Sequence, residues 1–112
     1  MRRKKIVLIG TALLLAASAL WATLPGQPAR SSYIGKRFMT FEMNNGPSYK
    51  WKKLADGGSL QWWRSDLAGC CVGRYESGVG NRCELLIELD KNRIIRQIRI
   101  LEHGSACNIA LR

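Results

Sequence analysis

The sequence offers few groups for catalysis. It has a single histidine, His103, with Cys107 four positions later, and a Cys–His nucleophile would require a free, activated thiolate. Glu84 and Glu88 alternate along a strand-like segment as solvent-facing residues do, so no carboxylate pair is placed for acid–base chemistry. The glycines in the middle of the chain are scattered, and none stands between a strand and a helix as a phosphate-binding loop requires. We therefore expect a non-catalytic protein that holds no cofactor and no metal.

The part of the chain available for folding is short and lacks internal repeats. Residues 25–112 suffice for one small domain, whose apolar core alone gives marginal stability. Covalent staples are therefore expected, and all four cysteines lie in this part of the chain. Four cysteines allow three pairings, and the sequence alone does not choose between them.

Acidic residues are scarce relative to basic ones. There are 18 Lys and Arg against 8 Asp and Glu, which gives a formal net charge of +10. Four of these cations form a cluster at the N-terminus, so 14 cations and a net charge of +6 belong to the remaining chain. The cluster consists of Arg2, Arg3, Lys4 and Lys5.

An apolar run from Ile6 to about Leu24 follows the basic cluster. A positive segment followed by an apolar segment is the architecture of a secretory signal, in which the charges stay on the cytoplasmic side of the membrane. We expect residues 1–24 to direct export, so that the domain works in the periplasm or at the periplasmic face of the inner membrane.

Removal of this segment and its retention as an anchor are both compatible with the sequence. The small residues Ala17, Ser18 and Ala19 have the spacing that signal peptidase uses. The apolar run is also about long enough to span a bilayer, and Trp21 stands where an interfacial anchor would. No cysteine follows the run closely, which argues against a lipidated N-terminus.

An exported basic domain meets anionic partners outside the cytoplasm. These are lipid headgroups, envelope polymers or the acidic face of another protein, and we expect no nucleic acid among them. The alternative is that the excess of Lys and Arg only keeps a small domain soluble. The sequence defines neither the partner nor the oligomeric state.

A linker and a short helix are predicted to come first in the exported part. Residues 25–34 have the Pro, Gly and Ser content of a linker. Ile34, Phe38 and Phe41 have the spacing of one face of a short helix. The Gly-Pro pair at positions 46 and 47 is a standard helix stop.

A β-hairpin is predicted next, with residues 49–52 and 59–64 as strands and a turn at residues 56–58. Its interleaved aromatic and basic residues are of the kind that bind anionic ligands by stacking and charge. Trp62 and Trp63 point to opposite faces of a strand, so at least one of them should lie outside the core. The alternative is that Trp51 and one of this pair fill the core while the cations are solvated. The candidate binding patch consists of Tyr49, Lys50, Trp51, Lys52, Trp62, Trp63 and Arg64.

The clearest β pattern lies near the C-terminus. Odd-numbered residues of the segment 83–89 share an apolar face. Residues 94–101 form the return strand, and its even-numbered residues, Arg96 among them, are expected to share one face. In the turn at residues 90–93, Asn92 is the best candidate for a left-handed conformation. Four charged residues could pair across the two strands: Glu84, Glu88, Arg96 and Arg99.

The cysteines suggest one staple and one unusual pair. Cys83 and Cys107 flank the last hairpin and are the favoured disulfide. Cys70 and Cys71 stand in a long predicted loop over residues 66–82, and adjacent α-carbons about 3.8 Å apart are too close for an unstrained disulfide. Each of them bonds elsewhere, or one is buried and free, or the two form a thiol-redox or metal-responsive pair, which is the alternative function. An absence of free thiols in the denatured, unreduced protein would remove that alternative.

These elements predict an α+β fold over residues 35–112, with a short N-terminal helix packed on an antiparallel sheet of three to four strands and stapled by disulfides. Over about residues 35–107 they resemble the small periplasmic domains of the outer-membrane lipoprotein group related to BamE (the SmpA/OmlA group). The matching features are Gly35-Lys36, Asn45-Gly46-Pro47, the hairpin from Trp51 to Arg64 and the turn from Asp90 to Ile94.

The lipidated cysteine of the BamE-like group is absent from this chain. What the resemblance implies is an interaction module with a helix on a small antiparallel sheet and no catalytic site. Taken with the composition, it predicts a small basic envelope protein that binds a protein partner or the membrane or envelope surface.

Overall fold

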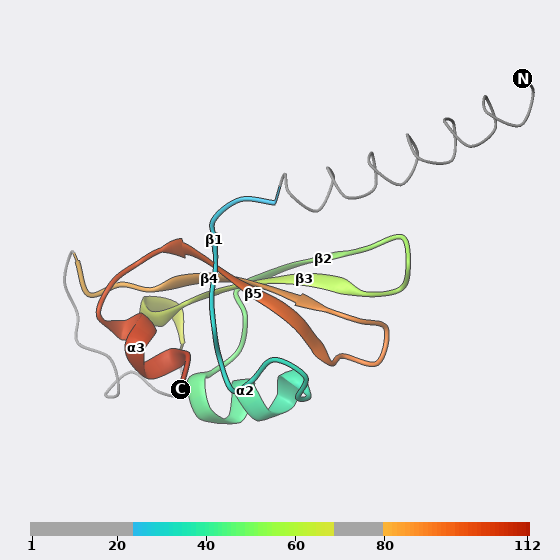
Figure 1. Ribbon diagram of the computed structural model, residues 1–112, viewed down its shortest axis with the longest axis horizontal. Coiled ribbons are helices and arrows are strands. Elements are labelled where there is room, and N and C mark those ends of the chain that lie inside the picture. Colours follow the sequence, from blue (N-terminus) through green and yellow to red (C-terminus); the bar gives the residue numbers. More distant parts are fainter. Residues whose placement is uncertain (1–23, 69–79) are drawn as a thin grey trace, which may run out of the picture.

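The computed structural model describes residues 24–68 and 80–112, and it has a five-stranded antiparallel sheet with two helices against one face (Figure 1). The predicted targeting segment falls almost entirely outside these ranges, as do Cys70 and Cys71. The elements in chain order are β1 (Gln27–Pro28), α2 (Phe38–Asn45), β2 (Lys50–Lys53), β3 (Ser59–Arg64), the 3₁₀ turn η1 (Ser65–Leu67), β4 (Glu84–Leu89), β5 (Ile95–Glu102) and α3 (Ala106–Ala110).

The sheet order is β1-β5-β4-β3-β2, and every neighbouring pair is antiparallel. An antiparallel sheet with helices on one face is an α+β arrangement, as predicted. Two finer expectations were wrong. The sheet has five strands rather than three to four, and the helix is not the first element, because Gln27–Pro28 already pairs with β5 ahead of it. Within the described ranges, no helix is long and apolar enough to cross a membrane.

Both predicted hairpins are present. In β4, Leu85, Ile87 and Leu89 are fully buried, as their alternation predicts, and the favoured disulfide joins Cys83 at the start of this strand to Cys107 in α3. Strand β2 pairs with β3 around the predicted turn. The alternation of apolar residues therefore predicted the position of β4 and its inner face.

The return strand β5 departs from strict alternation. Leu89 pairs with Ile95 whereas Glu88 pairs with Gln97, so Arg96 is an extra residue in a β-bulge. The bulge brings Ile95 and Ile98 to the same buried side, although strict alternation would have separated them. Ile98 and Ile100 share the inner face as expected, but the placing of Arg96 with them and of Ile95 on the opposite face was wrong.

The turn between β4 and β5 is organised by an aspartate. The Asp90 carboxylate accepts hydrogen bonds from the main-chain N–H groups of Asn92 and Ile94, at 2.8 and 2.9 Å. The left-handed residue is Arg93, with φ of 62°, and not Asn92 as expected. Because Asp90 fixes the conformation two residues along, the reversal of φ falls one position later than composition suggested.

The N-terminal helix is one turn shorter than its apolar spacing indicated. Phe38 and Phe41 are buried on the inner side of α2, whereas Ile34 precedes the helix and is exposed. Gly46 ends the helix with φ of 90°, and its N–H bonds to the carbonyl of Glu42. The Gly-Pro stop thus acts as predicted.

The stretch predicted as a linker, residues 25–34, contributes to the domain. Gln27–Pro28 forms β1, and the N–H of Ala29 donates to the carbonyl of Ile98 at 2.8 Å. Tyr33 is buried and packs edge-on against Phe41 with ring centroids 5.2 Å apart. This segment covers the outer edge of β5.

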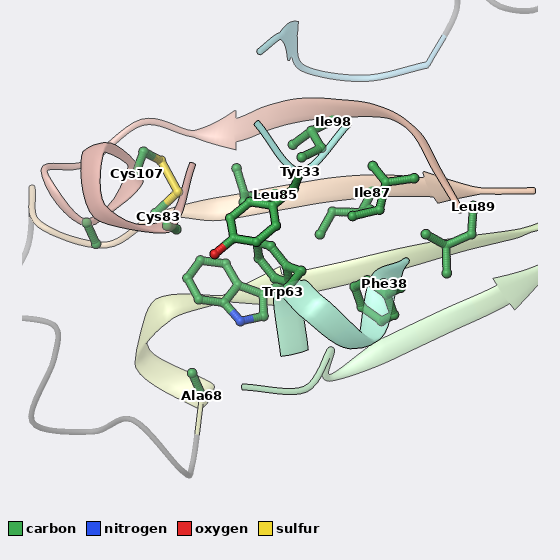
Figure 2. Close-up of a cluster of buried hydrophobic side chains, with 14 residues drawn as sticks. Tyr33, Phe38, Trp63, Ala68, Cys83, Leu85, Ile87, Leu89, Ile98 and Cys107 are labelled. Carbon is green, nitrogen blue, oxygen red and sulfur yellow. A yellow bond between two sulfur atoms is a disulfide. The ribbon is translucent and has the colours of Figure 1, made fainter. Parts of the chain in front are cut away.

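The core lies between the sheet and the two helices (Figure 2). Trp63 of β3 packs edge-on against Phe41 of α2 at 5.5 Å, and its indole N–H donates to the carbonyl of Asn45 at 3.1 Å. At the other end, the disulfide ties α3 to the start of β4. The helices therefore cover one face of the sheet, and no helix of the described ranges lies against the other.

Candidate functional site

The face of the sheet opposite the helices carries a row of mixed basic and aromatic residues. Strand register aligns Lys50 with Trp62, Trp62 with Leu86, and Leu86 with Arg99. Directly paired residues share a face of a sheet, so these four side chains cross four strands side by side. A parallel row runs from Lys52 through Leu60 and Glu88 to Gln97.

Two aromatic side chains on this face make cation–π contacts with neighbouring basic residues. The Lys50 ammonium lies 4.6 Å from the ring centre of half-buried Trp62, and the Arg64 guanidinium lies 5.9 Å from that of Tyr49. Such cation–π contacts leave the charge unneutralised while fixing its position. Arg64 also pairs with Asp66 at 2.7 Å, so it contributes less free charge than Lys50 does.

Tyr49 acts here as a neutral hydrogen-bond donor. Its hydroxyl donates to the carboxylate of Glu84. Burial, and after it the hydrogen bond to Glu84, raises the pKa of Tyr49 to about 12. The phenol therefore keeps its proton at any physiological pH and fixes the position of the Glu84 carboxylate by its hydrogen bond.

Arg99 connects this face to the incoming N-terminal segment. Its guanidinium donates to the carbonyl oxygens of Pro25 and Gly26, at 2.9 and 2.6 Å. Those partners are neutral, so the positive charge of Arg99 is positioned without being cancelled. The expected pair between Arg99 and an acid of β4 is not formed, since Arg99 lies opposite Leu86 and its Nε and Nη2 donate to the two carbonyl groups.

Glu88 was expected to face solvent, but it is only 4% exposed and is the one buried acid that the described residues place on this face. Its Oε2 has no hydrogen-bond partner among the described residues and lies 3.8 Å from Arg96, which confirms one expected cross-strand pair. Burial raises the pKa of Glu88, and the charge of Arg96 opposes that rise. Arg96 is shared with Asp56, at 2.9 Å, and so only partly compensates Glu88.

Replacing Glu88 by glutamine should stabilise the protein near neutral pH. A carboxyl whose folded-state pKa is raised stabilises fully below its unfolded pKa, 4.5 in the unperturbed group, and loses that contribution as the pH rises through the folded value. Thermal melts should therefore show Glu88→Gln above the parent at about pH 7 by a few degrees, with the gap closing by about pH 4. A lower melting temperature for the variant at neutral pH would mean that the contact with Arg96 outweighs burial.

Two tryptophans of the predicted patch do not belong to this face. Trp63 is 0% exposed and is a core residue, because its register partner Leu85 lies on the helix side of the sheet. Trp51 is 66% exposed but shares the helix-side row of Gln61 and Ile87. The sequence could not choose the inward member of the Trp62–Trp63 pair without knowing the strand register.

Arg99 was missed as a member of the patch because it lies far along the chain, on β5. The structure places it in the same row as Lys50 and Trp62. In the sequence, its position in the alternating pattern indicated only a solvent-facing strand residue. We define the open-face patch as Tyr49, Lys50, Lys52, Trp62, Arg64 and Arg99.

Groups for catalysis or metal binding are not gathered in the described ranges. No three His, Cys, Asp or Glu residues there lie close enough together to hold a metal ion. Cys107 is oxidised in the disulfide with Cys83 and cannot serve as a thiolate next to exposed His103. Cys70 and Cys71, on which the redox alternative rests, lie outside the described residues.

Comparison with known proteins found no matching family model, no matching curated protein and no matching solved structure. The resemblance to BamE-like domains therefore stays a prediction from the sequence.

Proposed function

We propose that the protein is a non-catalytic, exported basic domain that lies with its open-face patch against an anionic membrane surface. The observation that supports this proposal is the pair of hydrogen bonds from the Arg99 guanidinium to the carbonyl oxygens of Pro25 and Gly26. These residues directly follow the predicted targeting segment, so the chain enters the domain at the patch. If that segment stays in the bilayer, the open face of the sheet is the face nearest to the headgroups.

The chemistry of the patch suits lipid headgroups. Each Lys or Arg near an anionic surface contributes about 1 kcal/mol, and a tryptophan set among such cations has the amphipathic shape favoured at membrane interfaces. A patch of this size binds weakly alone, but a membrane-inserted segment together with a basic patch forms a stable two-part anchor. An acidic face of another protein is the second possible source of negative charge, and the following test separates the two.

Full-length protein should be incorporated into vesicles of phosphatidylcholine with or without phosphatidylglycerol and treated with an amine-acetylating reagent. We expect phosphatidylglycerol to protect Lys50 and Lys52 by at least about twofold, measured by mass spectrometry. Lys91 is the internal control, because it is exposed on the helix side of the sheet. Equal acetylation of all three lysines in both vesicles would contradict membrane contact and favour a protein partner.

A matched pair of variants tests the role of the patch charge. Lys50→Glu and Lys91→Glu change the net charge equally. Lys50→Glu should abolish the protection of Lys52 in phosphatidylglycerol vesicles, whereas Lys91→Glu should leave it intact. If both variants lose protection to the same extent, net charge alone governs the approach to the membrane.

A further inference from the structure

We propose that the free edge of β2 and the groove beside Trp51 bind an extended acidic segment of another protein as an added antiparallel strand. This inference does not depend on the proposed membrane contact. It rests on the main chain of β2 and the groove on the helix side of the sheet, and it shares only the side chains of Lys50 and Lys52 with the open-face patch.

The two edges of the sheet differ within the described part of the chain. The edge of β5 is covered by β1 and by the segment that follows it up to Arg37. In this segment the N–H of Gly35 donates to the carbonyl of Ile95 at 2.8 Å, and the N–H of Ile95 donates to the carbonyl of Lys36 at 2.9 Å. Beyond β2 no described strand follows, and all four of its residues are exposed. An exposed edge of unpaired main-chain groups is a template for strand addition.

The register identifies the main-chain groups that face outward. The N–H of Leu54 donates to the carbonyl of Gly58 at 2.8 Å, across the hairpin turn. Alternate residues of an antiparallel strand turn their main-chain groups to the same neighbour, so Lys50 and Lys52 face β3. Trp51 and Lys53 therefore present their N–H and C=O groups at the free edge.

A groove lies on the helix side of this edge. Its volume is about 400 Å³, and it is bounded by the hairpin β2–β3, by α2 and by the turn between β4 and β5. Trp51 forms one wall, with Phe38 of α2 and Lys53 also lining the groove. A strand added beside β2 would direct every second side chain into this groove, where an apolar side chain could cover Trp51.

Charge selects the occupant. Three of the four residues of β2 are lysines, namely Lys50, Lys52 and Lys53. Lys52 and Lys53 have no carboxylate within ion-pair distance among the described residues. A second copy of this chain would bring the same three lysines to the edge and be repelled, as edge lysines generally prevent self-pairing. An acidic strand instead gains charge pairs at the same positions.

Register also specifies the partner sequence. In an added antiparallel strand, the residue directly opposite Trp51 exchanges hydrogen bonds with it and points its side chain to the groove. The residues on either side of it point to the open face, next to Lys50 and Lys52. The edge therefore suits an alternating segment with apolar residues on the groove side and carboxylates on the open side.

The probe is a fluorescein-labelled hexapeptide of alternating leucine and glutamate, titrated with full-length protein in non-ionic detergent and followed by anisotropy. We expect binding that is roughly tenfold weaker for a leucine–lysine peptide. N-methylation of the leucines removes the N–H groups that meet the edge and should weaken binding roughly tenfold, whereas N-methylation of the glutamates should change it by less than about twofold.

A matched pair of protein variants localises the site. Trp51→Ala should weaken peptide binding roughly fivefold, while Met43→Ala, which removes another exposed apolar side chain, from α2, should not. Thermal melts of both variants should match the parent, because neither side chain is in the core. The proposal is overturned if no peptide binds, if both N-methylated peptides lose affinity equally, or if a peptide with the same residues in blocks binds as well as the alternating one.

Discussion

Full-length protein in which Cys83 and Cys107 are both replaced by alanine should lose about 3 to 4 kcal/mol of unfolding free energy. The disulfide spans a sequence separation of 24 residues, and the chain-entropy model assigns a loop of that length about 3.5 kcal/mol. Natural domains are stable by only about 5 to 15 kcal/mol. The bond is thus a large part of what holds this small domain folded.

The position of the bond adds to its effect. It attaches α3, a helix of 5 residues, to the start of β4. A helix so short is not stable by itself. Ala106 and Ala110 are buried in the core, and the disulfide is the one covalent tie among the contacts that hold this described segment there. Replacing both cysteines avoids leaving one thiol to form a new pair.

Urea unfolding of parent and double variant, each with and without reductant, measures this contribution. Reductant should lower the midpoint of the parent to near that of the variant and leave the variant almost unchanged. If the variant matches the oxidised parent, the staple is dispensable. If reductant destabilises the variant as strongly as the parent, another disulfide carries the stability.

The sequence was most informative where apolar residues alternate regularly along a strand that buries one face. Leu85, Ile87 and Leu89 predicted both the strand and its inner side, because a sheet covered on one face repeats with period two. The flanking positions of Cys83 and Cys107 likewise favoured the pair that the structure joins. These are local signals, and short-range geometry was enough to interpret them.

The errors arose where the outcome depended on distant residues. The bulge at Arg96 inserts one residue into β5, and nothing in the composition of this segment indicates it. Strand β1 consists of two residues in a Pro-containing stretch and forms by pairing with β5. Such a short strand has no propensity of its own, so only its partner defines it. Both features depend on pairing over long sequence separations.

The candidate site shows the same division. The hairpin residues Lys50, Trp62 and Arg64 were found by interleaved charge and aromaticity, but the choice between Trp62 and Trp63 required the register with β4. Arg99 joins them from β5, and the sequence indicated it only as a charged residue of the last hairpin. The edge of β2 and its groove were likewise invisible, since an edge is defined by what does not lie next to it.

Trp63→Ala should be the most destabilising single substitution in the sheet, costing about 3 to 5 kcal/mol. Trp63 is 0% exposed and packs against Phe41, so its removal leaves a large cavity between β3 and α2. The indole N–H also donates to the carbonyl of Asn45 at the end of that helix. The substitution therefore removes both the packing and a hydrogen bond that fix α2 on the sheet.

The neighbouring tryptophan supplies the matched control. Trp62 occupies the adjacent position and points to the open face, where it is only half-buried. Trp62→Ala should cost no more than about 1 to 1.5 kcal/mol, since little apolar area would become exposed and no enclosed cavity would form. Trp63→Phe should fall between the two alanine variants, because it retains most of the ring and loses the N–H donor.

Denaturant midpoints of the three variants, measured by circular dichroism so that loss of a tryptophan does not alter the signal, give this order directly. Equal destabilisation by Trp62→Ala and Trp63→Ala would contradict the register, because the two side chains would then be equally buried. The ranking also fixes which variant is useful for binding work. Trp62→Ala can report on the open-face patch in a folded protein, whereas any loss of binding by Trp63→Ala would report unfolding.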